Sequence, residues 1–127
     1  MTSYDVGYFA FPSESNNLIT ITWPGLTASE VGQPFPRGTF VDRSMQVEGT
    51  FGAGGSVVIE GSNDGANFHT LHDPFSNLLS LTASGIPQIT EICAFIRPRV
   101  VGGDGSTSIT CTMTSTPSQT PSDGFRV

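Results

Sequence analysis

Residues 56–71 read SVVIEGSNDGANFHTL, and this stretch decides the fold. Its first part, 56–60, is a short run rich in β-branched residues and has the length of a strand. The turn sequence Asn-Asp-Gly follows at 63–65, and these residue types tolerate positive φ at little cost. A second strand is expected over 67–71. The stretch therefore predicts an antiparallel hairpin.

Further strands are predicted where apolar and polar residues alternate, or where a short apolar run lies between turn residues. They are expected at 18–23, 45–51, 78–82, 92–100 and 106–114. In the stretch 92–100, Ile92, Ala94 and Ile96 are predicted to share the apolar face. Pro98 has no N–H to donate and predicts an edge strand or a bulge.

The chain has 127 residues, enough for one domain with a single core. Its 15 Gly and 9 Pro are spread along the sequence, as short strands joined by turns require. The predicted fold is all-β, a single antiparallel β-sandwich of the jelly-roll or Ig-like kind with extended terminal arms. The domain is expected over 18–114. Pro24–Gly38 is too rich in Pro and Gly for a regular element and is predicted to be a loop, with Phe35 as an anchor.

The two ends of the chain are expected to be partner-binding arms, an N-terminal arm over 1–17 and a C-terminal tail over 115–127. In the N-terminal arm, Gly and Pro interrupt the aromatic residues, and the C-terminal tail is rich in Ser, Thr and Pro. For the N-terminal arm, an edge strand packed on its own domain is an equal alternative. The candidate anchors are Tyr4, Tyr8, Phe9, Phe11 and Phe125.

Charge and hydropathy limit the partners. The chain has 5 Arg, no Lys and 11 Asp plus Glu, so its formal net charge is −6 and a phosphate backbone would be repelled. No apolar run approaches the roughly 18 residues of a membrane helix, and the N-terminus lacks the pattern of a signal peptide. Neither nucleic acid nor membrane is an expected partner.

No residue cluster predicts catalysis. His69, His72 and Asp73 are close in sequence, but positions 69 and 72 face opposite sides of a strand and would converge on a metal only across a bend. The polar residues at 63–67 and around Asp104 are better explained by turns than by a calcium site. No metal, cofactor or enzymatic activity is therefore expected.

The two cysteines are expected to be buried, reduced thiols. If Val101 pairs with Ser106 across a four-residue turn, Cys111 lies opposite Ile96 and points away from Cys93. Arg97 and Arg99 share a strand face and are candidates for gripping a carboxylate or a sugar. The plainer alternative is an internal ion pair with Glu48, Glu60 or Glu91.

Two stretches carry a family resemblance, VVIEGSNDGANF at 57–68 and AFIRPRV at 94–100. Together they resemble the β-sandwich decoration, or cement, proteins on the heads of tailed double-stranded DNA bacteriophages. They are also similar to the discoidin-type jelly roll, a carbohydrate- or lipid-binding module. Phe68 stands where the discoidin turn has a tryptophan, which favours the phage resemblance.

The resemblance to cement proteins implies a structural virion protein without enzymatic activity. Such a protein is assembled in the bacterial host cytoplasm as a homotrimer or homodimer. It then binds the capsid exterior and bridges major capsid protein subunits through many modest contacts. The expected contact residues are the five arm aromatics together with Phe35, Arg97 and Arg99. The alternative is a carbohydrate-binding module of a tail fibre or adhesin, and a tail or neck component is a third hypothesis.

Overall fold

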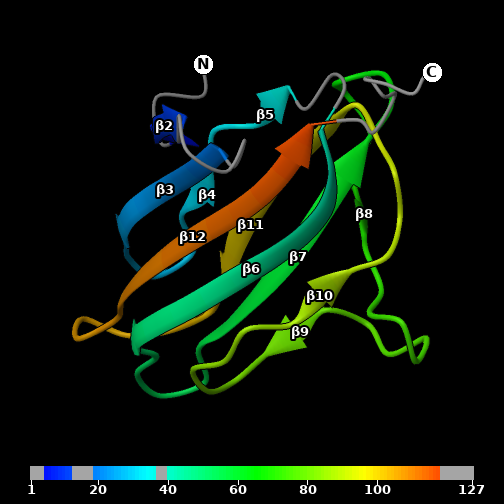
Figure 1. The fold of residues 1–127 in the computed structure, drawn as a ribbon. Helices are drawn as coiled ribbons and strands as arrows, with labels where there is room; N and C mark the ends of the chain where they lie inside the picture. The colour runs from blue at the N-terminus through cyan, green and yellow to red at the C-terminus, as the bar shows by residue number, and fades with distance from the viewer. Residues whose placement is uncertain (1–4, 13–18, 37–39, 118–127) are drawn as a thin grey trace, which may run out of the picture.

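The structure, a computed structural model, describes residues 5–12, 19–36 and 40–117. Within these ranges the chain forms β-strands in two sheets that pack face to face (Figure 1). The predicted all-β sandwich is therefore confirmed. All strand pairs are antiparallel except the short parallel pair β1–β4.

The first sheet is built around β7 and β11, which pair over seven residues each. Shorter strands flank them on both sides. The strands of this sheet are β1 (Asp5–Val6), β4 (Val31–Gly32), β5 (Phe35–Pro36), β7 (Ser56–Ser62), β8 (His69–Thr70), β9 (Ser80–Leu81) and β11 (Phe95–Val101).

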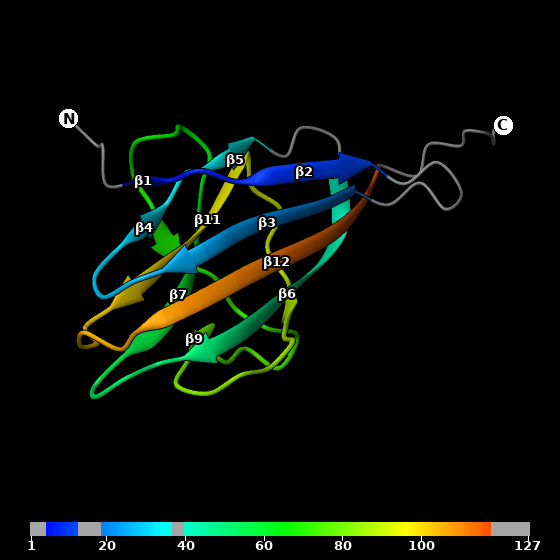
Figure 2. The ribbon, with the colours of Figure 1, turned by 90° about the vertical axis from the view of Figure 1, so that its left-hand side faces the viewer.

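The second sheet has the order β10-β6-β12-β3-β2, and Figure 2 looks onto it with β7 and β11 behind. Its strands are β2 (Phe9–Pro12), β3 (Ile19–Leu26), β6 (Phe40–Thr50), β10 (Gln88–Ile89) and β12 (Ser108–Pro117). Cys111 of β12 lies between Val47 and Trp23, so three fully buried side chains form one row across the sheet. The inward faces predicted for 18–23 and 45–51 follow the same alternation.

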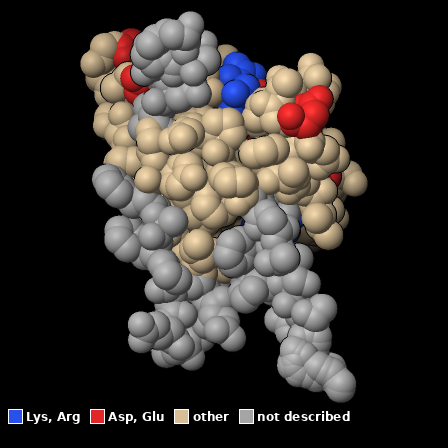
Figure 3. Space-filling view, turned by 90° about the horizontal axis from the view of Figure 1, so that it is seen from above, with Lys and Arg blue, Asp and Glu red and all other residues tan. Residues whose placement is uncertain are grey.

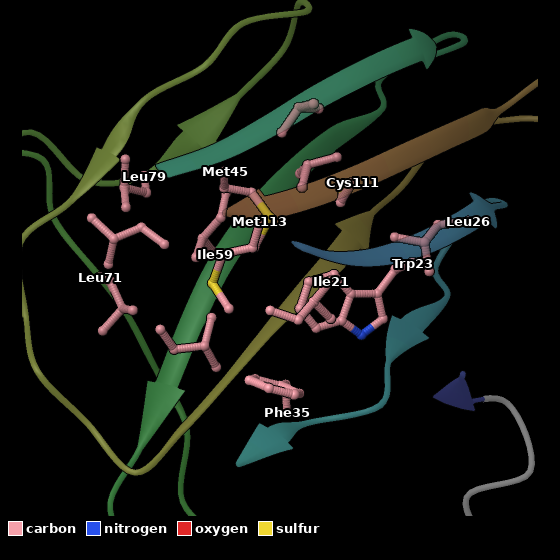
Figure 4. Packing of buried hydrophobic residues seen from close by; sticks show 14 of the residues in the cluster. Ile21, Trp23, Leu26, Phe35, Met45, Ile59, Leu71, Leu79, Cys111 and Met113 are labelled. Carbon is pink, nitrogen blue, oxygen red and sulfur yellow. The ribbon is translucent and has the colours of Figure 1, made fainter. Parts of the chain in front are cut away.

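The hydrophobic core fills the space between the sheets (Figure 4). Trp23 is fully buried, and its indole N–H donates to the carbonyl of Gln33 at 2.8 Å. This bond matters because a buried indole N–H without an acceptor would be costly. The largest fully buried side chains besides Trp23 are Ile21, Leu26, Met45, Ile59, Ile96, Ile109 and Met113.

The segment 24–38 departs from the predicted loop. Its first residues belong to β3, and β4 and β5 pair with β11. Gly32 permits this close packing, since a Cβ there would lie 2.8 Å from both Trp23 and Pro98. Tertiary contact with a central strand thus forms two short strands in a segment whose Gly and Pro content predicts a loop.

Pro98 lies in a central strand, not at the predicted edge or bulge. Its neighbour Val100 donates its N–H to Glu30 on the β4 side, and alternate residues of a strand direct their N–H groups to the same side. The nitrogen of Pro98, which carries no hydrogen, therefore faces the gap between β4 and β5. Neither strand pairs with β11 at that position, so no backbone hydrogen bond is lost there.

Parts of both predicted arms belong to the sandwich. Strands β1 and β2 pair with β4 and β3, which is the edge-strand alternative, and β12 continues to Pro117, past the expected domain end at Thr114. Residues 1–4, 13–18 and 118–127 lie outside the described ranges.

The predicted register between 92–100 and 106–114 is wrong. Instead of forming a hairpin, the chain crosses from β11 in one sheet to β12 in the other, and Cys111 pairs with Val47 and Trp23 rather than with Ile96. Ile92 is 72% exposed and lies before β11, so its predicted place on the apolar face is also wrong. Cys93 and Cys111 are both buried and carry reduced thiols.

Candidate functional site

The Arg97 and Arg99 side chains both bind Glu60 on the neighbouring strand. Arg97 Nε donates to Oε1 at 3.0 Å, and Arg99 Nε donates to Oε2 at 2.9 Å. The Arg97 guanidinium also lies 3.8 Å from the centre of the Phe68 ring, a cation–π contact. Of the three internal partners considered from the sequence, the structure selects Glu60. A role of these arginines in partner binding stays a prediction.

The described aromatic candidates pack into the sandwich. Tyr8 is half-buried and makes edge-to-face contacts with Trp23 at 5.9 Å and with Phe35 at 5.2 Å, measured between ring centres. Phe35 itself is 6% exposed. These two rings therefore stabilise the domain in the isolated chain.

The other aromatic candidates are only partly described. The backbone of Phe9 and Phe11 pairs with β3, opposite Thr22 and Thr20, but the structure does not describe their side chains. Tyr4 and Phe125 lie outside the described ranges.

Large exposed apolar side chains gather elsewhere, in the linking segment 71–94 between β8 and β11. Four of the five such residues in the described parts of the chain lie there, the fifth being Val101 at the end of β11. They are Phe75 (84% exposed), Leu78, Ile86 and Ile92. The sequence signal is misleading for two of them, because Leu78 and Ile92 lie in stretches predicted to be strands, 78–82 and 92–100. The sequence places the whole segment inside the predicted domain and predicts no partner contact on it.

The linking segment is held in place by hydrogen bonds around His72. The backbone of His72 bridges that of Leu78 on one side and accepts the N–H of Thr90 on the other. Its N–H donates to Glu91 Oε1 at 2.8 Å, and its ring Nδ1 lies 2.5 Å from Oε2. The buried Arg43 donates to the carbonyl of Glu91. Leu78 and Ile92 are therefore presented on ordered backbone.

Two turns near this segment are also ordered by carboxylates. Asp64 accepts the N–H groups of Asn67 and Ala66 and the side-chain donors of Asn67 and Ser62, and these bonds hold its pKa well below the usual value of 3.8. Asp73 accepts the N–H groups of Asn77 and Phe75, with Asn77 contributing most to the lowering of its pKa. Both carboxylates therefore stabilise the turns in which they lie.

A third turn, 102–107, uses Asp104 in the same way. Asp104 accepts the hydroxyl and N–H of Ser106 and the N–H of Ala53, and its pKa is lowered to about 2. In the described ranges, no three His, Cys, Asp or Glu side chains are placed to hold a metal ion. The same part of the chain contains no helix with the length and apolar character needed to cross a membrane.

A cleft of about 340 Å³ lies between β8 and the chain at 91–93. The two segments run along the right-hand side of Figure 1. The cleft is lined by Gly61, Ser62, Asn63, Asn67, His69, Thr70, Leu71, His72, Glu91, Ile92 and Cys93. His69 and His72 thus line one cleft, although the sequence predicts that they face opposite sides of a strand. This volume is in the range of small-ligand sites, which span roughly 300 to 1,000 Å³.

The end of the sandwich shown in Figure 3 is sparsely charged. Among the residues that are not grey, small groups of acidic and basic atoms interrupt a surface made mostly of other residues. The three described arginines are engaged with Glu60 or with the carbonyl of Glu91. Contacts through the described residues at this end would therefore rest largely on shape, apolar area and hydrogen bonding.

The fold places the chain among the all-β sandwich proteins. No family description matches its sequence, and a comparison with curated protein sequences finds no match either. Among solved structures, the SPBc2 prophage-derived protein YomS is similar, with a TM-score of 0.59 and 12% sequence identity. The match covers 77% of this chain and 93% of that chain. The likeness shows a shared sandwich fold.

Proposed function

We propose that this chain is a structural virion protein of a tailed bacteriophage that binds the outer surface of the capsid. In this role a homotrimer or homodimer bridges major capsid protein subunits and stabilises the shell. The protein acts by contact and carries out no reaction. Its place is the capsid exterior, after assembly in the host cytoplasm.

The observation that carries the proposal is the set of exposed apolar side chains on the linking segment. Phe75, Leu78, Ile86 and Ile92 are 60% to 84% exposed. Covering a large apolar side chain contributes about 1.5 to 3 kcal/mol before the entropic cost of association. A capsid lattice repeats such a contact many times, so a modest individual contact is enough.

Two further observations support a phage role. The sandwich resembles a prophage-derived protein over most of both chains. The sequence stretches at 57–68 and 94–100 resemble phage cement proteins. In the structure these stretches form the central strand pair β7–β11 and the turn beside it.

The test mixes the purified chain with undecorated phage heads, separates bound from free protein by sedimentation, and heats the bound heads. The proposal expects saturable binding and a higher rupture temperature. If neither is observed, the proposal is wrong. Electron microscopy of assembled particles distinguishes the capsid surface from a neck or tail position.

Variants then locate the contact. Phe75→Ser combined with Leu78→Ser is expected to weaken head binding about tenfold or more, because two apolar contacts are lost. Val101→Ser is the matched control, since Val101 is 38% exposed but lies outside the linking segment. Equal losses for both variants would count against a contact through this segment.

A further inference from the structure

The cleft beside β8 is lined by one carboxylate, Glu91, and a second carboxylate, Asp64, lies next to the lining residue Asn63 in the chain; both already accept hydrogen bonds. Glu91 accepts the backbone N–H of His72 with one oxygen and faces its ring with the other. The Oδ1 atom of Asp64 accepts from Ser62, Ala66 and Asn67, and its Oδ2 atom accepts from the amide of Asn67. The hydrogen bonds of these carboxylates therefore orient the neighbouring side chains, and neither carboxylate is proposed as a cation ligand.

The groups that remain for a ligand are hydrogen-bonding atoms of amide and imidazole side chains. Asn63 Oδ1 accepts the N–H of Ala94 at 3.1 Å, which leaves its NH₂ group for a ligand. Asn67 uses its NH₂ on Asp64, which leaves its carbonyl oxygen. His72 turns Nδ1 to Glu91, which leaves Nε2, and the His69 ring is exposed at the rim. Donors and acceptors are thus interleaved around the opening.

The interior of the cleft is apolar. Leu71 is 5% exposed and Cys93 is 9% exposed, and both belong to the buried core. Ile92 completes the apolar wall with a side chain that is 72% exposed. A ligand that fills the cleft would cover this exposed side chain, which is a favourable change.

We propose that this cleft binds one neutral pyranose unit of a glycan. A pyranose ring carries hydroxyl groups that each donate one hydrogen bond and accept others, so it can satisfy an interleaved rim of amides and imidazoles. Its C–H face is apolar and suits the wall formed by Ile92. The volume of the cleft admits one or two sugar rings.

Electrostatics selects against charged sugars. The Glu91 carboxylate lines the cleft, the Asp64 carboxylate is hydrogen-bonded to the lining residue Asn67, and the formal net charge of the chain is −6. A sialic or uronic acid would be repelled by both. The site therefore favours neutral hexoses and N-acetylhexosamines. This binding site goes beyond the proposed capsid role and does not depend on it.

The test is a titration of the ¹⁵N-labelled protein with glucose, galactose, mannose and N-acetylglucosamine, followed by NMR. N-acetylneuraminic acid serves as the charged comparison. We expect at least one neutral sugar to give saturable shifts at 61–72 and 91–93, with millimolar affinity because the ligand is small. The charged sugar is expected to bind at least about fivefold more weakly.

Two variants tie any binding to the cleft. His69→Ala and Ile92→Ser remove one rim group and the exposed wall, and each is expected to weaken sugar binding about fivefold or more. Both residues are exposed, so the amide spectrum of each variant should stay that of a folded protein. Ile86→Ser is the matched control for Ile92→Ser, since Ile86 is 63% exposed and does not line the cleft.

Three outcomes would overturn the proposal. In the first, none of the four neutral sugars gives saturable shifts. In the second, the shifts centre outside the cleft. In the third, binding is unchanged in both cleft variants. Because heads are not used, failure here leaves the capsid proposal intact, and failure of head binding leaves this one intact.

Discussion

The imidazole Nδ1 of His72 lies 2.5 Å from Oε2 of Glu91, although the two residues are 19 positions apart in the chain. This pair fastens the end of the linking segment to the chain after β8. Both the cleft and the exposed Ile92 depend on it for their position.

Glu91→Gln is expected to lower the melting temperature at pH 7 and to flatten its pH dependence in acid. Burial raises the pKa of Glu91, but hydrogen bonds from His72 lower it more, so its net pKa is below the usual 4.5. A carboxyl with a lowered folded-state pKa stabilises the fold above its usual pKa and loses that contribution as the pH falls through the lower value.

The measurement for Glu91→Gln is thermal unfolding from about pH 6 to pH 3, the window in which a carboxyl with a lowered pKa changes its contribution. Glu48→Gln is the control, because Glu48 is exposed on β6. If the melting temperature of Glu91→Gln falls with decreasing pH as steeply as that of the wild type, the His72–Glu91 pair does not stabilise the fold.

Glu60→Gln is expected to destabilise the domain by about 2 to 4 kcal/mol, because it removes the carboxylate that two arginines share. The side chain of Glu60 is 6% exposed, whereas those of Arg97 and Arg99 are 22% and 37% exposed and regain some hydration. Urea unfolding measures the loss. A change within about 0.5 kcal/mol of the wild type, the usual range for surface substitutions, would mean that the three side chains do not act together.

Tyr8→Ala is expected to cost about 1 to 3 kcal/mol in the isolated protein, because its ring packs on Trp23 and Phe35. Phe75→Ala, at a residue that is 84% exposed, is the matched aromatic control and should change stability by less than about 0.5 kcal/mol. Equal stability of Tyr8→Ala and the wild type would contradict the packing of Tyr8 on Trp23 and Phe35.

The Cys111 thiol is expected to resist a thiol-specific reagent at pH 8 until the protein unfolds. Burial raises its pKa to about 12, and the reactive thiolate is therefore scarce. A Cys93→Ser variant isolates its signal, with no reaction in the native state and one thiol after denaturation in urea. Rapid native labelling of that variant would place Cys111 at the surface and contradict the core.

The strands that alternation predicted from the sequence are those with one face toward solvent and the other toward the core. The alternation in 18–23 and 45–51 reports such a face directly, because successive side chains of a strand point to opposite sides. Strand β7 is buried on both faces, and its run of β-branched residues predicted it without alternation. Alternation in 92–100 placed Ile92 on the apolar face of a strand. Strand β11 begins only at Phe95, and Ile92 is exposed.

Long-range pairing was not predictable. The residues 102–105 between β11 and β12 suit a hairpin turn, yet the chain there changes sheets. Both outcomes satisfy the local turn chemistry, and the difference lies in which apolar faces end up buried together. The cleft was missed for the same reason, since its walls come from segments about 20 to 30 residues apart.

By itself, the amino-acid sequence determined that this chain forms short strands around one apolar core, because residue alternation and turn chemistry act over a few neighbouring positions. It also restricted the internal partner of Arg97 and Arg99 to three carboxylates. Only the tertiary structure decided that Glu60 is that partner, that Tyr8 packs on Trp23, and that His69 and His72 line one cleft. Those outcomes depend on the register between segments, and register is set by the burial of the whole sandwich.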